Sequence, residues 1–130
     1  MTVVLDSWAV MRLLDGVEPT ATRVDEQLGT GTAIMSWINL GEVFYVLRRA
    51  HGEAEARRTI KDLEASLQAV LPDSALVLEA ARIKSEWRMS YADAFAAATA
   101  TRFDAPLWTG DPELLIRDAP WRPYDLSGTR

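Results

Sequence analysis

Short apolar runs alternate with longer amphipathic stretches along most of this chain. Residues 2–5 and 32–37 are β-branched and apolar runs bounded by polar residues or glycine, which is typical of buried strands. Between residues 40 and 47, apolar residues recur every three or four positions, which is typical of one face of a helix. The pattern therefore predicts strands and helices in turn from the start of the chain.

The same pattern extends to the end of the chain. We predict further helices over residues 8–14, 19–28, 53–68, 74–87 and 91–102, a short helix opening at 111–113, and short strands at 69–71, 105–108 and 121–126. Strands that alternate with helices favour an α/β domain with a largely parallel sheet. No repeat or linker divides the sequence, so we expect one domain over residues 1–130, with an ordered core at 1–126 and a frayed tail at 127–130.

Composition narrows the chemistry. The 130 residues include no cysteine, which excludes disulfides, zinc–thiolate sites, iron–sulfur clusters and thiolate nucleophiles. The single histidine, His51, cannot form a two-histidine acid/base pair. No apolar run approaches the roughly 20 residues that span a bilayer, and the first residues lack the features of a signal peptide. We therefore expect a cytoplasmic protein with no membrane contact.

Four carboxylates stand where predicted strands meet predicted helices. Asp6 ends the first strand, and Glu42 lies in the first turn of the helix after the second strand. Asp93 lies in the first turn of an alanine-rich helix, and Asp111 follows the strand that ends at Trp108. Strand ends and following helix starts share one edge of a parallel sheet. Asp6, Glu42 and Asp111 should therefore converge there, joined by Asp93 if its helix begins at the same edge.

Each acid also fits a structural role when it is taken singly. Residues 39–42 and 90–93 have the spacing of capping boxes, Asp111 before Pro112 resembles an N-cap, and Asp6 and Ser7 are suited to helix entry. Taken together, three or four carboxylates at one edge repel one another unless a cation neutralises them. Mg²⁺ or Mn²⁺ accepts carboxylate oxygens and suits phosphoryl chemistry.

The acid-bearing segments resemble those of PIN-domain ribonucleases, and more narrowly VapC-type toxins of bacterial toxin–antitoxin pairs. The similar segments read VLDS at 4–7, NLGEV at 39–43, YADAFAAATA at 91–100 and LWTGD at 107–111, and their order and spacing match from Val3 to about Leu126. The resemblance implies a three-layer α/β/α sandwich, a homodimer and a small VapB-like antitoxin. It also implies an acidic metal centre of Asp6, Glu42, Asp93 and Asp111, supported by Ser7 and Thr109.

The leading hypothesis is a metal-dependent endoribonuclease, a hydrolase in which metal-activated water cleaves RNA and leaves a 5′-phosphate and a 3′-hydroxyl. Asp6 and Asp93 would be the most direct ligands of Mg²⁺ or Mn²⁺, with Glu42 and Asp111 holding a second ion or ordering water. The net charge of −5 argues against a diffuse basic surface. RNA contacts must then be local, and Arg12 and Arg88 adjoin the acid-bearing segments.

Three other functions compete with this hypothesis. A receiver-like signalling domain also carries an acidic Mg²⁺ site, but it needs a lysine after a late strand, and Lys61 and Lys84 fall in predicted helices. A haloacid-dehalogenase-like phosphatase needs an aspartate where Trp8 stands. A nuclease-inactive PIN-fold binding module would not need the intact set of acids.

Overall fold

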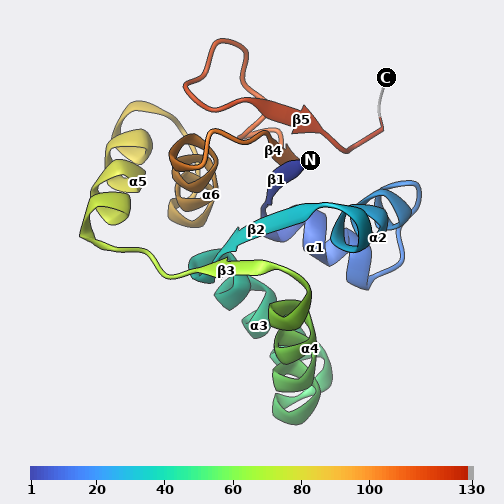
Figure 1. Cartoon of the computed structure of the whole chain (residues 1–130). Helices are drawn as coiled ribbons and strands as arrows, with labels where there is room; N and C mark the ends of the chain where they lie inside the picture. Colours follow the sequence, from blue (N-terminus) through green and yellow to red (C-terminus); the bar gives the residue numbers. More distant parts are fainter. Residues whose placement is uncertain (129–130) are drawn as a thin grey trace.

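A five-stranded parallel sheet lies between two layers of helices in the computed structural model, which describes residues 1–128 (Figure 1). The strands are β1 (Thr2–Leu5), β2 (Thr32–Ser36), β3 (Gln68–Val70), β4 (Leu107–Thr109) and β5 (Pro123–Asp125), in the order β3-β2-β1-β4-β5. The helices are α1 (Ser7–Leu14), α2 (Thr20–Thr30), α3 (Trp37–His51), α4 (Glu53–Ser66), α5 (Ser74–Glu86) and α6 (Tyr91–Arg102). Every strand pair is parallel, which confirms the predicted α/β/α sandwich.

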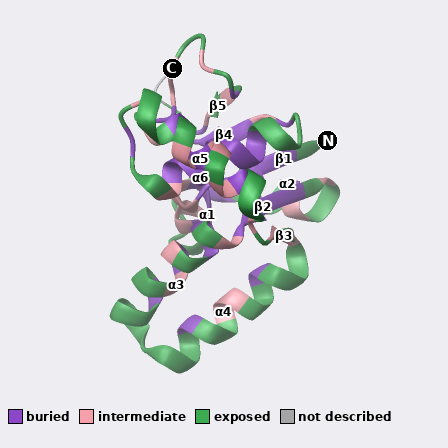
Figure 2. Cartoon of the chain, turned by 90° about the vertical axis from the view of Figure 1, so that its left-hand side faces the viewer, coloured by how far each residue is buried: buried purple, intermediate pink, exposed green. Residues whose placement is uncertain are grey.

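The two faces of the sheet pack against separate hydrophobic cores. One core joins the sheet to α5 and α6, and the other joins it to α1, α2, α3 and α4. Helix α6 is buried continuously from Asp93 to Ala100, because its alanines let it approach both the sheet and α5 closely (Figure 2). A helix buried on all sides lacks an amphipathic pattern, so its position in the core follows from its small residues.

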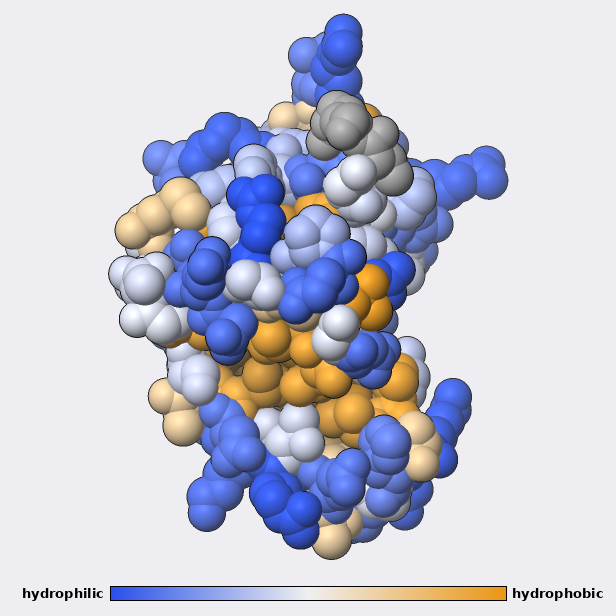
Figure 3. Space-filling model, turned by 90° about the vertical axis from the view of Figure 1, so that its right-hand side faces the viewer, coloured by the Kyte–Doolittle hydropathy of each residue, from blue (hydrophilic) through white to orange (hydrophobic). Residues whose placement is uncertain are grey.

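Helices α3 and α4 form a hairpin that projects from the body of the molecule and is mostly exposed (Figure 2). Gly52 joins them with a φ of +92°, a backbone conformation that side chains other than glycine rarely adopt. Apolar side chains line a groove along this hairpin, and Figure 3 shows apolar surface gathered between the hairpin and the body. The groove measures about 400 Å³ and is lined by Trp37, Leu40, Gly41, Phe44, Arg57, Ile60, Lys61 and Glu64.

Helix α3 begins earlier than the capping-box spacing at 39–42 predicts. Ser36 is its N-cap and accepts a hydrogen bond from the Ile38 N–H at 3.1 Å. Asn39 is therefore inside the helix, and Glu42 lies in the second helical turn instead of the first. The prediction was wrong because the serine hydroxyl at the end of β2 starts the helix three residues before Asn39 can.

The two other predicted helix starts differ in outcome. Of the two residues suited to the entry of α1, Asp6 is the N-cap and Ser7 is the first helical residue, whereas the prediction of a short helix at 111–113 is wrong. The segment after Asp111 forms a single turn in which the Leu114 N–H donates to the Asp111 carbonyl, and no helix follows. The Leu114 carbonyl instead accepts a hydrogen bond from the Trp121 indole at 3.0 Å, which turns the chain toward β5.

Two remaining features concern the ends of the chain and its helices. The predicted fraying of residues 127–130 stays a prediction, since 129 and 130 lie outside the described residues. Among residues 1–128, no helix combines the length and the apolar character that crossing a membrane requires.

Candidate metal centre

Asp6 lies at the carboxyl end of β1 and is almost wholly buried, with 1% of its surface exposed. One carboxylate oxygen accepts the Ala9 N–H at 2.9 Å, as an N-cap of α1 does. The other oxygen accepts a hydrogen bond from the Thr109 hydroxyl at the end of β4. The Thr109 oxygen in turn accepts the Asp111 N–H at 3.0 Å. Thr109 therefore lies between two of the predicted acids and is hydrogen-bonded to both residues.

Within residues 1–128, no basic side chain lies within ion-pair distance of Asp6. Burial raises the pKa of Asp6 to about 7, and the hydrogen bonds from Thr109 and Ala9 only partly offset this effect. The negative charges of Asp111 and Glu42 raise the pKa of Asp6 further. Asp6 thus interacts electrostatically with two other predicted acids, as expected for side chains near one edge of a sheet.

Asp93 lies in the first turn of α6, near the same edge of the sheet. The Ser90 hydroxyl caps the helix by accepting the Asp93 N–H at 3.1 Å, but the second half of the expected capping box is absent. The Ser90 N–H instead donates to Glu113 at 3.3 Å. The Asp93 carboxyl group is therefore not used for capping. Burial, a hydrogen bond with Asp111 and the charge of Asp111 raise the pKa of Asp93 to about 9.

Asp93, Asp111 and Glu113 each offer a carboxylate oxygen, and these oxygens lie within 4.8 Å of one another. Asp111 also accepts the Glu113 N–H at 3.0 Å, which folds the turn back on itself. Asp6 and Glu42 adjoin this trio but are not part of it. Glu113 is not among the acids predicted from the sequence. The signal that could have found it is its spacing of two residues from Asp111 across Pro112, a pattern that also fits the start of a helix.

Glu42 is held by side chains from two helices. The Ser7 hydroxyl of α1 donates to Glu42 Oε1 at 2.7 Å. Asn39 Nδ2 donates to the same oxygen at 3.3 Å and to the Ala92 carbonyl of α6 at 3.1 Å. Within residues 1–128, the buried Asn39 Oδ1 has no hydrogen-bond partner. Asn39 therefore links α3 to α6 beside the acids, whereas the capping-box spacing predicts only a contact at the start of its own helix.

The acids open onto a cavity of about 420 Å³. Its lining comprises Ser7, Trp8, Met11, Arg12, Glu42, Tyr45, Val46, Ser90, Asp93, Asp111 and Glu113. The Arg12 guanidinium lies 4.3 Å from the centroid of the Trp8 ring. A Cβ at Gly110 would lie only 2.2 Å from this indole, so Trp8 packs against bare backbone. Arg88, the other predicted RNA contact, is exposed and lies outside this lining.

A family model for the PIN domain matches residues 3–119. The chain belongs to the PIN domain family. No curated protein matches its sequence significantly.

Solved structures share this PIN fold at low sequence identity. VapBC2 from Rickettsia felis, bound to a promoter DNA fragment, matches with a TM-score of 0.76 and 14% identity over 96% of this chain and 98% of that chain. VapBC-1 from nontypeable Haemophilus influenzae matches with a TM-score of 0.74 and 20% identity over the same shares. Mycobacterium tuberculosis VapC20, described as a sarcin–ricin loop cleaving toxin, matches at 0.70 and 15% over 86% and 92%.

The acids of this PIN domain fit a hard divalent cation. Within residues 1–128, no arginine or lysine nitrogen lies within ion-pair distance of Asp6, Glu42, Asp93, Asp111 or Glu113. All the donors are carboxylate oxygens, the ligands that Mg²⁺ and Mn²⁺ prefer. The pKa values of Asp6 and Asp93 are raised because burial and neighbouring carboxylates destabilise their charged forms, which a bound cation would stabilise.

Proposed function

We propose that this PIN-domain protein is a VapC-type toxin, a divalent-metal-dependent endoribonuclease that hydrolyses RNA phosphodiester bonds. The observation that carries the proposal is the trio of carboxylates at the sheet edge, whose oxygens lie within 4.8 Å of one another and form no ion pair with a basic group among residues 1–128. The names of the structural neighbours, which are VapBC complexes and a VapC toxin, support it. We also propose that the protein acts in the cytoplasm.

The residues that would hold Mg²⁺ or Mn²⁺ are Asp6, Glu42, Asp93 and Asp111, with Glu113 as a fifth candidate. Such an ion, when bound, lowers the pKa of water and neutralises negative charge on a phosphodiester. Thr109 and Ser7 donate hydroxyl hydrogen bonds to Asp6 and Glu42 and so fix the orientation of these carboxylates. Loss of such an orienting partner weakens a metal centre even though the ligands remain.

The proposed reaction also determines the products. The cavity lining contains no histidine and no lysine, and His51 lies at the far end of α3, where it faces Glu55 at 3.6 Å. In the proposed reaction the nucleophile is water activated by the metal and not the 2′-hydroxyl of the RNA. We therefore expect products with a 5′-phosphate and a 3′-hydroxyl.

The proposed inhibitory partner is a VapB-like antitoxin whose C-terminal segment carries an arginine. The apolar groove of the α3–α4 hairpin, which Figure 3 shows, suits the apolar face of such a segment. A guanidinium beyond that face would find several carboxylate acceptors at the acidic centre. We expect an antitoxin without its C-terminal segment to lose inhibition. Full inhibition by the shortened antitoxin would contradict this part of the proposal.

We further propose a homodimer, which measurement of the molar mass in solution tests. A molar mass equal to that of one chain at micromolar concentration would contradict it.

The central experiment is cleavage of labelled RNA with Mg²⁺ or Mn²⁺, with and without EDTA, followed by analysis of the product ends. We expect cleavage that EDTA abolishes and that leaves a 5′-phosphate. RNA binding without cleavage in either metal would favour a nuclease-inactive binding module. A receiver-like domain is disfavoured because Lys61 lies on α4 and Lys84 donates to the Met89 carbonyl at 2.8 Å, so neither lines the acidic cavity.

A further inference from the structure

A second and larger cavity, of about 860 Å³, lies beside β5 at the edge of the sheet. It is bounded by the loop that precedes β5, by β5 itself and by Arg23 of α2 (Figure 1). Its charged lining residues are Arg23, Arg117, Arg122, Asp118 and Asp125. Three arginines against two aspartates give it a positive balance, in contrast with the net charge of −5 of the chain.

An aromatic stack with an arginine forms one wall of this cavity. Tyr124 stacks on Trp108 with ring centroids 5.5 Å apart and an angle of 29° between the ring planes. The Arg23 guanidinium lies 5.1 Å from the Tyr124 centroid and donates a hydrogen bond to the Tyr124 hydroxyl. Tyr124 keeps 39% of its surface exposed although its neighbour Trp108 is buried. The wall thus presents an aromatic ring and a guanidinium together to solvent.

A chain of hydrogen bonds connects this wall to the acidic centre. The Thr20 hydroxyl of α2 donates to the Leu126 carbonyl at 2.7 Å, which holds α2 against the end of β5. The Leu126 N–H donates to the Thr109 carbonyl at 2.7 Å, and the hydroxyl of Thr109 contacts Asp6. Thr109 pairs with Asp125 across the two strands, so Asp125 lies roughly 10 Å from Asp6, about two strand spacings away.

A further cavity lies between these two and shares lining residues with each of them. This third cavity, of about 520 Å³, shares Trp8 and Arg12 with the acidic cavity and shares Leu115 and Asp125 with the cavity at β5. The path over these three cavities therefore passes two pairs of an arginine with an aromatic ring, first Arg12 with Trp8 and then Arg23 with Tyr124. Alternation of stacking surfaces and positive charge is the pattern by which proteins bind single-stranded nucleic acid.

The arginines along the path differ in how they are paired. Arg12, Arg23 and Arg117 form no ion pair with any residue in the described range 1–128. Arg122, in contrast, pairs with Asp104 at 2.7 Å. An arginine that is not neutralised by a carboxylate keeps its charge available for a phosphate. Arg23 and Arg117 are therefore the phosphate-binding candidates of the β5 cavity.

We propose that Arg23, Arg117 and Tyr124 form an anchor for the single-stranded RNA that flanks the bond to be cut. A base stacks on Tyr124, and the adjoining phosphates bind the two guanidinium groups. The path over Arg12 and Trp8 leads the strand to the acids. This inference rests on the proposed ribonuclease function, and it explains how a chain with a net negative charge gains affinity for a polyanion.

The test measures binding of a fluorescein-labelled oligouridylate in an Asp93→Asn background, with Mg²⁺ present and the RNA checked for integrity. We expect Arg23→Ala/Arg117→Ala to weaken binding about tenfold or more. The slope of log Kd against log salt concentration should decrease by about 1.4 for two lost phosphate contacts on a single strand. The control, Arg48→Ala/Arg58→Ala, makes the same charge change on exposed arginines of α3 and α4 and should leave the slope unchanged.

Variants of Tyr124 separate stacking from its hydroxyl group. Tyr124→Phe keeps the ring and should retain affinity within about twofold, whereas Tyr124→Leu should weaken binding about tenfold. Thermal melts identify any variant whose loss of binding comes from unfolding, and Arg23→Ala/Arg117→Ala changes only exposed side chains. Unchanged RNA affinity in that double variant and in a folded Tyr124→Leu overturns the anchor.

Two further outcomes are informative. Weaker binding of an antitoxin with unchanged RNA binding would assign the cavity to a protein partner and would also overturn the anchor. Failure of the wild-type protein to cleave RNA in Mg²⁺ or Mn²⁺ would refute the proposed function. It would leave the binding result to decide the anchor separately.

Discussion

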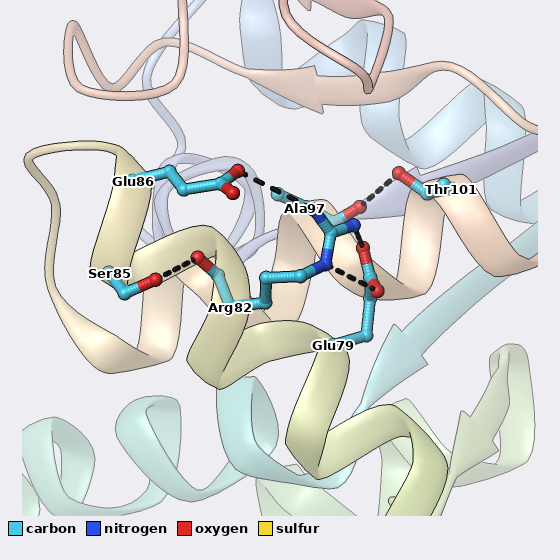
Figure 4. Close-up of polar contacts among 6 residues, drawn as sticks. All are labelled: Glu79, Arg82, Ser85, Glu86, Ala97 and Thr101. Carbon is cyan, nitrogen blue, oxygen red and sulfur yellow. Dashed lines mark hydrogen bonds and ion pairs between the residues drawn. The ribbon is translucent and has the colours of Figure 1, made fainter.

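Two groups of carboxylates in this protein are built in opposite ways. On the surface of α5, Arg82 lies between two glutamates and pairs with Glu79 at 2.5 Å and with Glu86 at 3.5 Å (Figure 4). At the sheet edge, Asp93 and Asp111 lie beside further acids, and none of them contacts a basic group within residues 1–128. Both groups bring carboxylates together, but only the group on α5 contains its own cation.

The difference has energetic consequences. Exposed pairs such as Arg82–Glu79 contribute little to stability, because water already solvates both partners. Burial without a cationic partner destabilises the charged form of a carboxyl group. The pKa values of Asp6 and Asp93 therefore rise to about 7 and about 9. The α5 group is complete within the chain. The acids at the sheet edge are neutralised only by a proton or by a cation from outside the chain.

The largest expected effect is that of Asp93→Asn on cleavage. We expect RNA cleavage to fall at least about a hundredfold, since a candidate ligand is lost. In EDTA, the variant should be as stable as the wild type or more stable, because asparagine is neutral at this position without taking up a proton on folding, as the raised pKa of Asp93 requires of the carboxyl group. Cleavage assays and thermal melts check both parts.

Glu79→Gln is the matched control for this change. It neutralises an acid that has its own arginine on the surface, so it should leave cleavage unchanged and change stability little. A large loss of stability in Asp93→Asn would indicate a structural role at the start of α6 in place of a catalytic one.

The second expected effect is stabilisation by divalent metal. At a Mg²⁺ or Mn²⁺ concentration one hundred times its Kd, binding to the folded state alone adds about 2.7 kcal/mol to the free energy of unfolding. This corresponds to a rise of several degrees in Tm for a domain of this size. Glu79→Gln should keep the full rise and Asp93→Asn should lose most of it. An equal rise in both variants would place the metal elsewhere.

A third change tests the support of Asp6. Thr109→Val keeps the shape of the side chain but removes the hydroxyl group that joins Asp6 to the Asp111 N–H. We expect a stability loss of about 1–3 kcal/mol, and a reduction in cleavage of about 10–100-fold. Thr99→Val is the control, since Thr99 is equally buried but donates only to the Phe95 carbonyl of its own helix. Equal cleavage by the two variants would contradict a supporting role for Thr109.

The sequence was sufficient to predict the fold and that acids from separate segments lie near one edge of the sheet, but the closest trio contains only Asp93 and Asp111 of the four predicted acids. Strand and helix patterns fix which residues end strands, and the parallel topology then brings those ends together. Asp6 and Asp111 follow β1 and β4, which are neighbours in the sheet, so their proximity depends only on strand order.

Details of capping and of the acid trio depend on contacts between distant segments. Glu113 reaches the Ser90 N–H across 23 positions and takes the place that the capping-box spacing assigns to Asp93. Asn39 binds the Ala92 carbonyl 53 positions away instead of capping α3. Local rules for helix ends cannot reveal such partners, because they consider only neighbours in sequence.

The smallest expected effect separates the two arginines that the sequence suggested for RNA binding. Arg12 lies on Trp8 within the acidic cavity, whereas Arg88 is exposed outside its lining. We expect Arg12→Ala to weaken RNA binding about threefold to tenfold, through loss of one phosphate contact and one cation–π pair. Arg88→Ala should have a smaller effect, because its charge acts through solvent.

Gel-shift measurements give the RNA affinities, and calorimetry should show unchanged metal binding in both variants. Unchanged RNA affinity in both variants would mean that the acidic cavity binds RNA without these arginines. An equal loss of affinity in both variants would mean that proximity to the acids does not decide which arginine contributes.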